Sequence, residues 1–362
     1  MKNKRDKLLV TFTEEQDYLQ FYRNLPKQIK KRIKSYHHWH SVSILDEDYE
    51  QLKDRFPIET NETPKKVYIE TNIPYRIHQI SMNDQIIPWG ISSIKAPEAW
   101  SNSQGQGIKI GIIDTGIDAT HPDLRGRMFG GINTADKTSP FVDPNGHGTH
   151  IAGIIAAINN HFGVVGVAPL SHLYSIKAFR ADGTALLTDL ADAIHWAMNE
   201  NIQILNMSFG SSETSVTLQK ALQAALRHGV IMVASAGNNG KTVDYPAKYS
   251  EVFAVGAIQS NKKVAEFSSH GKELNYVAPG VDILSTWPVS PYYNSLSGTS
   301  MAAPHISAIC ALLLTQKNNL TPAQVKSILD QSAVKLPGVS SHKQGKGVVM
   351  ASKAVGQLND RI

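Results

Sequence analysis

From about residue 105 onward, short apolar segments alternate with longer segments of helical periodicity. Three of the apolar segments are IKIGIID (108–114), HLYSIKAF (172–179) and IQILNMSFG (202–210), and one helical stretch between them is TDLADAIHWAMNEN (188–201). Strands that are apolar throughout are typical of a parallel sheet whose two faces are both covered by helices. The sequence therefore predicts an α/β fold with its functional residues in loops at the carboxyl ends of the strands.

The first 83 residues have a different character. Short strands such as KLLVTF (7–12) alternate with polar, helix-like stretches, so residues 1–83 predict a small α+β domain. The segment TNIPYRIHQISMNDQ (71–85) lacks sustained periodicity and contains a proline, which is typical of an exposed linker. We therefore expect two domains, residues 1–83 and residues 84–362.

Charge and composition narrow the possible partners. The formal net charge of +5 is spread along the chain, and the basic run KQIKKRIK (27–34) has the spacing of a solvated helix face rather than of a nucleic-acid-binding patch. The N-terminus has only a very short apolar stretch, so we expect neither a secretory signal nor a membrane span in this chain. The single cysteine, Cys310, excludes an internal disulfide and predicts a small buried hydrophobe. The compartment is left open.

An aspartate and a histidine lie where the predicted fold gathers its functional residues. Asp114 ends a strand in IIDTGIDATHPDL (112–124), a place where an aspartate by itself is more typical of a turn or a helix cap. His147 lies at a helix start in DPNGHGTHIAG (143–153), where a lone histidine is typically a surface cap. His147 and His150 have helical spacing, but they have no nearby partner cluster, so zinc is not expected.

A serine precedes a long apolar helix in SLSGTSMAAPHISAICALLL (295–314). Because serine and threonine commonly cap helices, a cap is the simple interpretation of Thr299 and Ser300. The chain order Asp114, His147, Ser300 is nevertheless the order of acid, base and nucleophile in subtilisins, and it differs from that of chymotrypsin and of the α/β-hydrolases. The sequence closely resembles the subtilisin family of serine proteases over essentially its whole length.

The resemblance implies a serine endopeptidase that acts through an acyl-enzyme intermediate. Ser300 would be the nucleophile, His147 the base and Asp114 the residue that orients the imidazole. Asn238 in VASAGNNG would complete the oxyanion site, although by itself it could be a turn residue. Residues 1–83 would be a folding assistant and inhibitory propeptide, removed by self-cleavage within about 76–83, and the mature enzyme would be a monomer.

The resemblance also assigns a substrate cleft for peptides and proteins. Two chain segments would pair with an extended substrate by strand addition. The assigned residues are Gly183 and Ala185 on one edge, Ser208, Phe209 and Gly210 on the other, and Leu187 and Leu190 in a pocket for the fourth residue before the scissile bond. The two leucines could equally be core residues, and the segment NMSFG could be a simple strand.

The primary specificity pocket is assigned to Asn239 and Asp244. The residue before the YP pair of YPAKYS lies at the base of this pocket in the family and is often glycine, whereas here it is Asp244. The resemblance therefore predicts a preference for basic side chains before the scissile bond. The alternative is an exposed turn aspartate neutralised by Lys241 or Lys248.

The loop AAINNHFGVVGVAP (156–169) resembles the family's calcium loop, although an asparagine pair there could also form only a turn. Ligation by oxygen atoms alone suits Ca²⁺ better than Mg²⁺. The expected ligands are the side chains of Gln85, Asp123 and Asn160 and the main-chain carbonyls of Ile158, Phe162 and Val164.

Two alternative interpretations belong to other functional classes. Residues 1–83 could be a permanent regulatory or docking domain. The whole chain could be a catalytically silent, protease-like binding or regulatory protein, but that hypothesis predicts damage to the triad or to Asn238, and the sequence shows none.

Overall fold

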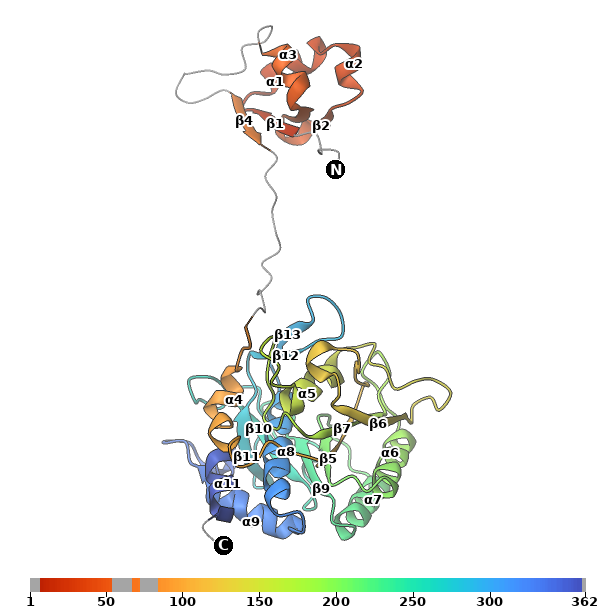
Figure 1. Cartoon of the computed structure of the whole chain (residues 1–362), viewed down its shortest axis with the longest axis vertical. Coiled ribbons are helices and arrows are strands. Elements are labelled where there is room, and N and C mark those ends of the chain that lie inside the picture. The colour runs from red at the N-terminus through yellow and green to blue at the C-terminus, as the bar shows by residue number, and fades with distance from the viewer. Residues whose placement is uncertain (1–6, 54–66, 72–83, 360–362) are drawn as a thin grey trace. The chain divides into compact units, whose positions relative to one another are not determined.

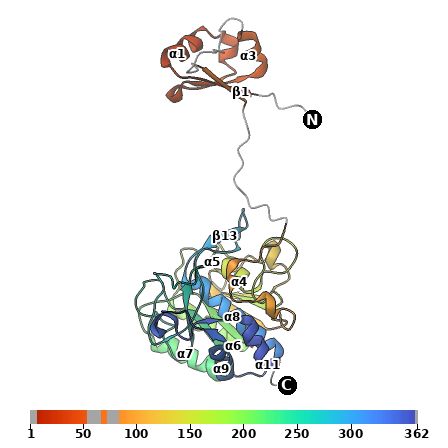
Figure 2. The same ribbon diagram turned by 90° about the vertical axis from the view of Figure 1, so that its left-hand side faces the viewer.

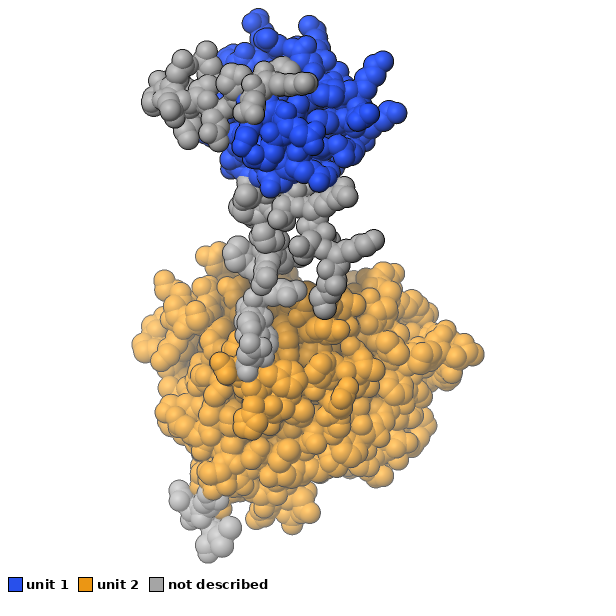
Figure 3. Space-filling view, turned by 45° about the horizontal axis from the view of Figure 1, so that its top comes forward, with its two compact units in different colours: residues 1–79 blue, residues 80–362 orange. Residues whose placement is uncertain are grey.

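The computed structural model describes residues 7–53, 67–71 and 84–359 (Figure 1). The chain forms two compact units, residues 1–79 and 80–362 (Figure 3). The division falls within the segment predicted as a linker, of which residues 72–83, including the expected cleavage site, lie outside the described part. The domain boundary after residue 83 stays a prediction.

The first unit is a small α+β domain. Its four-stranded antiparallel sheet has the order β2-β3-β1-β4. The elements are β1 (Lys7–Phe12), α1 (Glu15–Asn24), α2 (Lys27–Lys30), β2 (Lys34–Tyr36), β3 (Ser41–Leu45), α3 (Asp46–Leu52) and β4 (Val67–Thr71). Apolar side chains from sheet and helices, among them Val10, Phe21 and Ile44, form a core of their own. The basic run at 27–34 is helical only over its first half, in α2. Its last residue, Lys34, begins the edge strand β2.

The second unit is built on a nine-stranded sheet of order β14-β15-β11-β10-β9-β8-β5-β7-β6. Neighbouring strands are parallel except for β14 and β15. The strands are β5 (Lys109–Asp114), β6 (Met128–Asn133), β7 (His172–Lys177), β8 (Ile204–Met207), β9 (Ile231–Ser235), β10 (Phe253–Ile258), β11 (Leu274–Pro279), β14 (Ala333–Val334) and β15 (Val348–Val349). The predicted parallel sheet is confirmed, and burial of the central strands on both faces explains their unbroken apolar sequences.

Helices surround this sheet (Figures 1 and 2). The helices α5 and α8 pack against each other and against the central strands, while α6 packs against β5 and α7. The helices are α4 (Trp89–Ser93), α5 (His147–Ala156), α6 (Leu187–Asn199), α7 (Val216–Arg227), α8 (Thr299–Gln316), α9 (Pro322–Ser332), α10 (Ser341–Gln344) and α11 (Ala351–Asn359), and β12 (Ile283–Thr286) pairs with β13 (Tyr293–Leu296) in a hairpin. Within the described ranges, no helix combines the length and the apolar character needed to span a membrane.

The strand order places a crevice at the carboxyl end of β5. After β5, the chain forms β6 and β7 on one side of β5, with β7 next to it. It then forms β8, β9 and β10 on the other side. Connections that leave in opposite directions from neighbouring parallel strands open a space above the strand ends. Asp114 is the last residue of β5, and Ser208 directly follows β8.

Two histidines are buried in the helices beneath this crevice. His150 in α5 and His305 in α8 are both fully buried. His150 Nε2 donates to the carbonyl of Ile283 at 2.9 Å, and His305 Nδ1 donates to that of Met301 at 2.9 Å. Burial lowers the pKa of each histidine to about 4, because the charged imidazolium would be removed from water.

This burial predicts that the second unit loses stability in acid. A folded-state pKa near 4 lies below the ordinary value of 6.5, so the unfolded chain binds these protons more readily. The contribution of the two neutral histidines to the free energy of unfolding is fully present above pH 6.5. It is lost as the pH drops toward 4, by up to about 3 kcal/mol per histidine. The melting temperature of the Ser300→Ala chain should therefore fall steeply across this range, and adding His305→Gln should reduce the decline. An equal decline in both chains would contradict the prediction for His305.

Candidate active site

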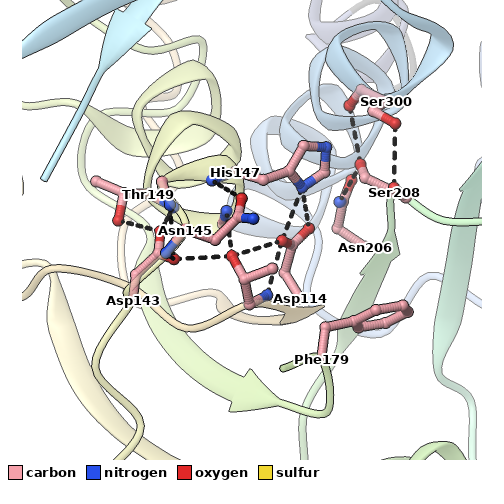
Figure 4. Close-up of polar contacts among 12 residues, drawn as sticks. Asp114, Asp143, Asn145, His147, Thr149, Phe179, Asn206, Ser208 and Ser300 are labelled. Carbon is pink, nitrogen blue, oxygen red and sulfur yellow. Dashed lines mark hydrogen bonds and ion pairs between the residues drawn. The ribbon is translucent and has the colours of Figure 1, made fainter. Parts of the chain in front are cut away.

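Asp114 and His147 lie in contact at the end of β5. Both carboxylate oxygens of Asp114 accept from His147 Nδ1, at 2.7 and 2.9 Å, so the hydrogen is on Nδ1 and Nε2 is left as the basic nitrogen (Figure 4). Asp114 is buried and also accepts from the backbone of Thr115, as a turn aspartate would, but its main partner is the imidazole. The alternative of a surface cap is wrong for His147, because Gly146 occupies the N-cap of α5.

The surroundings of His147 favour its charged form. Burial lowers the pKa of the imidazole, but the charge and hydrogen bond of Asp114 and the charge of Asp143 together outweigh burial, and the pKa is raised above its ordinary value. The site therefore stabilises an imidazolium, the form that a base takes after it has accepted a proton.

Ser300 lies in the first turn of α8. The N-cap of this helix is Gly298, without a side-chain cap, so the cap interpretation of Thr299 and Ser300 is wrong. The hydroxyl of Ser300 donates to the carbonyl of Ser208 at 3.1 Å, and the hydroxyl of Ser208 donates back to the carbonyl of Ser300 at 2.8 Å. Figure 4 shows His147 between Asp114 and the segment that carries Ser300.

A buried polar network binds the side chain of Ser208. Asn206 Nδ2 donates to Ser208 Oγ at 2.9 Å, and Ser307 Oγ donates to Asn206 Oδ1 at 2.8 Å. Asn206 and Ser307 are fully buried. The end of β8 is therefore fixed to α8 at Ser300 and again, about two turns further along the helix, at Ser307.

A cavity of about 390 Å³ opens beside these residues. Its lining residues are Asp114, Thr115, Asn145, His147, Phe179, Gly183, Ser208, Phe209 and Gly210. The sequence predictions did not include Thr115, Asn145 and Phe179. Asn145 stands in the DPNGHGTH motif and Thr115 directly follows Asp114 in the IIDTG motif, which were the available signals for them, whereas Phe179 carries no comparable signal.

The other predicted edge of the cleft agrees only in part. Gly183 lines the cavity, but its N–H donates to the carbonyl of Arg180 at 3.0 Å and is therefore not free to pair with a substrate strand. The backbone of Ala185 makes no hydrogen bond within the described ranges. Leu187 is 41% exposed, which excludes the core alternative for it, while Leu190 is half-buried against the core. The cavity lining includes neither leucine.

Asn238 lies beside the start of α8. Its Oδ1 accepts from the backbone N–H and from the hydroxyl of Thr299, both at 2.9 Å, and its Nδ2 remains a donor. This Nδ2 is close to Gly298, since a Cβ atom built there would lie 3.4 Å from it. The N–H of Ser300 belongs to the first helical turn, which lacks intrahelical acceptors. The side-chain N–H of Asn238 and the backbone N–H of Ser300 thus lie at the same helix N-terminus.

Asp244 lies between the segments that carry Ser208 and Asn238. Its Oδ1 accepts from Asn239 Nδ2 at 3.2 Å. A Cβ built on Gly237 would lie 2.3 Å from Asp244 Oδ2, and one built on Gly210 would lie 3.5 Å from the same atom. Burial raises the pKa of Asp244, against the hydrogen bond from Asn239 and the charge of Lys248. Neither Lys241 nor Lys248 forms an ion pair with it in the described part of the chain.

Residues 105–347 match the sequence profile of the subtilase family. The chain belongs to the subtilase family. Subtilisin BL of Lederbergia lenta is 42% identical over 272 residues, which are 75% of this chain and 99% of that protein. An alkaline protease of Shouchella clausii is 36% identical over 361 residues, 97% of this chain and 91% of that protein. Subtilisin E of Bacillus subtilis is 40% identical over 310 residues, 84% and 79% of the two chains. The protein is a subtilisin-like serine endopeptidase.

The residues predicted as calcium ligands in this subtilase lie together. Gln85 Nε2 donates to the carbonyls of Ile158 at 2.8 Å and Val164 at 3.2 Å, and Asn160 Nδ2 donates to Asp123 Oδ1 at 3.0 Å. The N–H of Phe162 donates to Asn160 Oδ1, which places this residue in the same loop. Within the described ranges, no group of three or more His, Cys, Asp or Glu side chains is placed to hold a metal ion. A cation here would rest on one carboxylate, two amides and main-chain carbonyls.

Proposed function

We propose that Asp114, His147 and Ser300 form the catalytic triad with which this endopeptidase hydrolyses peptide bonds. The observation that carries the proposal is the pair of hydrogen bonds from His147 Nδ1 to Asp114, which leaves Nε2 free to accept a proton. Ser300 donates to the carbonyl of Ser208, and Ser208 lines the same cavity as His147. Catalytic hydrogen bonds are often formed only when substrate is present, so the Ser300 contact in the free protein is compatible with this assignment.

The chemistry follows from these roles. Ser300 Oγ attacks the carbonyl carbon of the scissile bond while His147 Nε2 accepts its proton, and Asp114 stabilises the resulting imidazolium. His147 then donates that proton to the leaving amine as the C–N bond breaks, and an acyl-enzyme remains on Ser300. A water molecule, activated by the same imidazole, releases the acid product and restores Ser300. The negative charge that forms on the carbonyl oxygen is stabilised by Asn238 Nδ2 and by the N–H of Ser300.

We assign residues 1–83 as a propeptide that assists folding and inhibits the enzyme until the chain cleaves itself within about 76–83. Two features support this assignment. The first unit has its own core, and the similarity to the Shouchella clausii protease extends over 97% of the chain. The enzyme's own propeptide is then its first peptide partner. The mature enzyme is a monomer in this proposal.

Ser300→Ala should leave a folded, full-length chain that neither hydrolyses peptides nor processes itself. Removing the nucleophile of subtilisin lowers turnover about a million-fold, and a loss of that order is expected here. Mass spectrometry of the purified chain measures processing, and labelling with a serine-directed fluorophosphonate measures the nucleophile. Ser295→Ala, which changes an exposed residue of β13, is the matched control and should be processed and labelled normally. A folded wild-type chain that takes no label would instead favour the catalytically silent alternative.

We propose that Gln85, Asp123, Ile158, Asn160, Phe162 and Val164 bind Ca²⁺. The donor set fits a hard cation, because all its ligand atoms are oxygens. Asp123 is fully buried, burial raises its pKa, and it forms no ion pair in the described part of the chain. Its oxygens are instead met by donors from Asn160, Val164 and Tyr293. A bound cation would supply the compensating charge for this carboxylate.

A chelator should therefore lower the melting temperature, and added Ca²⁺ should restore it, because a ligand of the folded state alone stabilises that state. The measurement uses Ser300→Ala to avoid self-digestion. Asp123→Ala should abolish the response to Ca²⁺, whereas Asp192→Ala, which removes an exposed carboxylate, should retain it. A wild-type melting temperature that responds to neither reagent would overturn the site.

We propose that Asp244 gives the primary pocket a preference for lysine or arginine before the scissile bond. The position of its Oδ2 beside Gly210 and Gly237 supports this, as does the absence of a lysine ion pair in the described ranges. A cation at about 4 Å would gain up to about 4 kcal/mol at an effective dielectric constant near 20. Solvent and the nearby lysines reduce this gain to about 1–2 kcal/mol, or roughly tenfold in rate.

Peptide substrates with Arg, Phe or Leu before the scissile bond measure this preference. Wild type should favour Arg about tenfold, and both Asp244→Gly and the isosteric Asp244→Asn should lose the advantage. The Arg preference should also weaken as the pH falls toward the raised pKa of Asp244, because the carboxylate is then protonated. A wild type that prefers Phe or Leu, or a glycine variant that still prefers Arg, would show that Asp244 does not determine specificity.

A further inference from the structure

We propose that Asp143 is a second, positioning carboxylate of the active site, which joins the segment carrying Asp114 to the helix carrying His147. The inference rests on the proposed triad, because it concerns the geometry and charge around the proposed base. Asp143 lies in the loop before α5 and is 4% exposed. It does not line the substrate cavity, so its effect would pass through other residues.

Asp143 Oδ1 joins two parts of the chain. It accepts from the hydroxyl of Thr115 at 2.8 Å, and that hydroxyl lies 3.3 Å from Asp114 Oδ1. It also accepts from the backbone N–H groups of Asn145 at 3.0 Å and Gly146 at 2.8 Å. Thr115 therefore lies between two carboxylates, one that holds the imidazole and one that holds the loop leading to it.

The second oxygen of Asp143 fixes the first turn of α5. Oδ2 accepts from the backbone N–H of Thr149 at 2.9 Å and from its hydroxyl at 2.7 Å. A carboxylate in this place satisfies N–H groups that lack intrahelical partners and interacts favourably with the helix dipole. All five contacts of Asp143 come from N–H or O–H donors, so an amide at this position would direct its own NH₂ group at donors.

Thr115 is also held from its main chain. Its carbonyl accepts from the ammonium of the buried Lys177 at 2.5 Å, and Lys177 donates to the carbonyl of Phe179 at 3.0 Å. The residue that follows Asp114 is thus fixed by side chain and main chain together. Asp143 shares the side-chain half of this restraint with α5, because the Thr115 hydroxyl also accepts from the backbone N–H of Gly148 at 3.0 Å.

The charge of Asp143 adds to its positional effect. The charged or titratable groups that face His147 are Asp114 from β5, Asp143 from the preceding loop and His150 from α5 itself. Lys177 from β7 faces the two carboxylates, and His305 from α8 faces His150. Of these groups, Asp114 and Asp143 favour the imidazolium. Removing the Asp143 charge should therefore lower the pKa of His147.

The test uses Asp143→Asn in the full chain. NMR titration of the His147 imidazole, in the Ser300→Ala background, should show its pKa lowered by roughly half a unit to one unit. In the active chain, the acid limb of kcat/KM should shift to lower pH by the same amount. At a pH where His147 is fully neutral, kcat should still be reduced about tenfold or more through lost positioning, with KM nearly unchanged.

Thr149→Val is the matched control. It removes the hydroxyl contact to Asp143 Oδ2 but keeps the negative charge, so the pKa of His147 should stay at the wild-type value while kcat falls modestly. If Asp143→Asn does not fold, Asp143→Glu keeps the charge with altered geometry and should lower kcat without lowering the pKa of His147.

Two outcomes would overturn parts of the scheme in distinguishable ways. If His147→Ala abolishes activity but Asp143→Asn leaves both the pH profile and kcat at wild-type values, Asp143 has no positioning role and the triad stands. If His147→Ala retains wild-type activity, the proposed triad itself is wrong.

Discussion

The contact between Asp114 and His147 depends on two separate parts of the fold meeting with little tolerance. Asp114 is fixed by the parallel strands on both sides of β5, and His147 is the first residue of a helix that packs beneath the hairpin of β12 and β13. Two glycines allow this approach. A Cβ on Gly148 would lie 2.1 Å from the carbonyl of Gly116, and Gly116 itself adopts a left-handed φ of 115°. The backbone can therefore bring acid and imidazole into contact only where side chains are absent.

The third member of the site depends on the core. Nearly every residue of α8 between Thr299 and Leu314 is buried, so the helix cannot shift along its axis without disturbing packing throughout the second unit. Because Ser300 lies at the N-terminus of this helix, its backbone position is fixed by the same packing. The polar network of Asn206, Ser208 and Ser307 then fixes the side of the helix that faces the cleft. One buried helix thus positions both the proposed nucleophile and the N–H donors beside it.

The sequence was sufficient to predict the parallel sheet and the residues at its strand ends, because these depend on local periodicity and on motifs such as HGTH and GTSMAAP. It was insufficient where a property depends on distant segments. The turn that uses the N–H of Gly183, the exposure of Leu187 and the wall formed by Phe179 arise from how loops fold against one another. Asp143 was visible in its motif, but its link to Thr115 spans 28 positions of sequence and follows only from the fold.

Asp244 is flanked by Gly210 and Gly237, and this separates two properties of the enzyme. A side chain at Gly237 would collide with the carboxylate and would also require an unfavourable φ of 108°, so backbone alone lies on this side of Asp244. Under the specificity that we propose for Asp244, the choice of substrate side chain depends mainly on this one carboxylate. A substitution at residue 244 would then change which peptides are cut and would leave the proposed triad of Asp114, His147 and Ser300 in place.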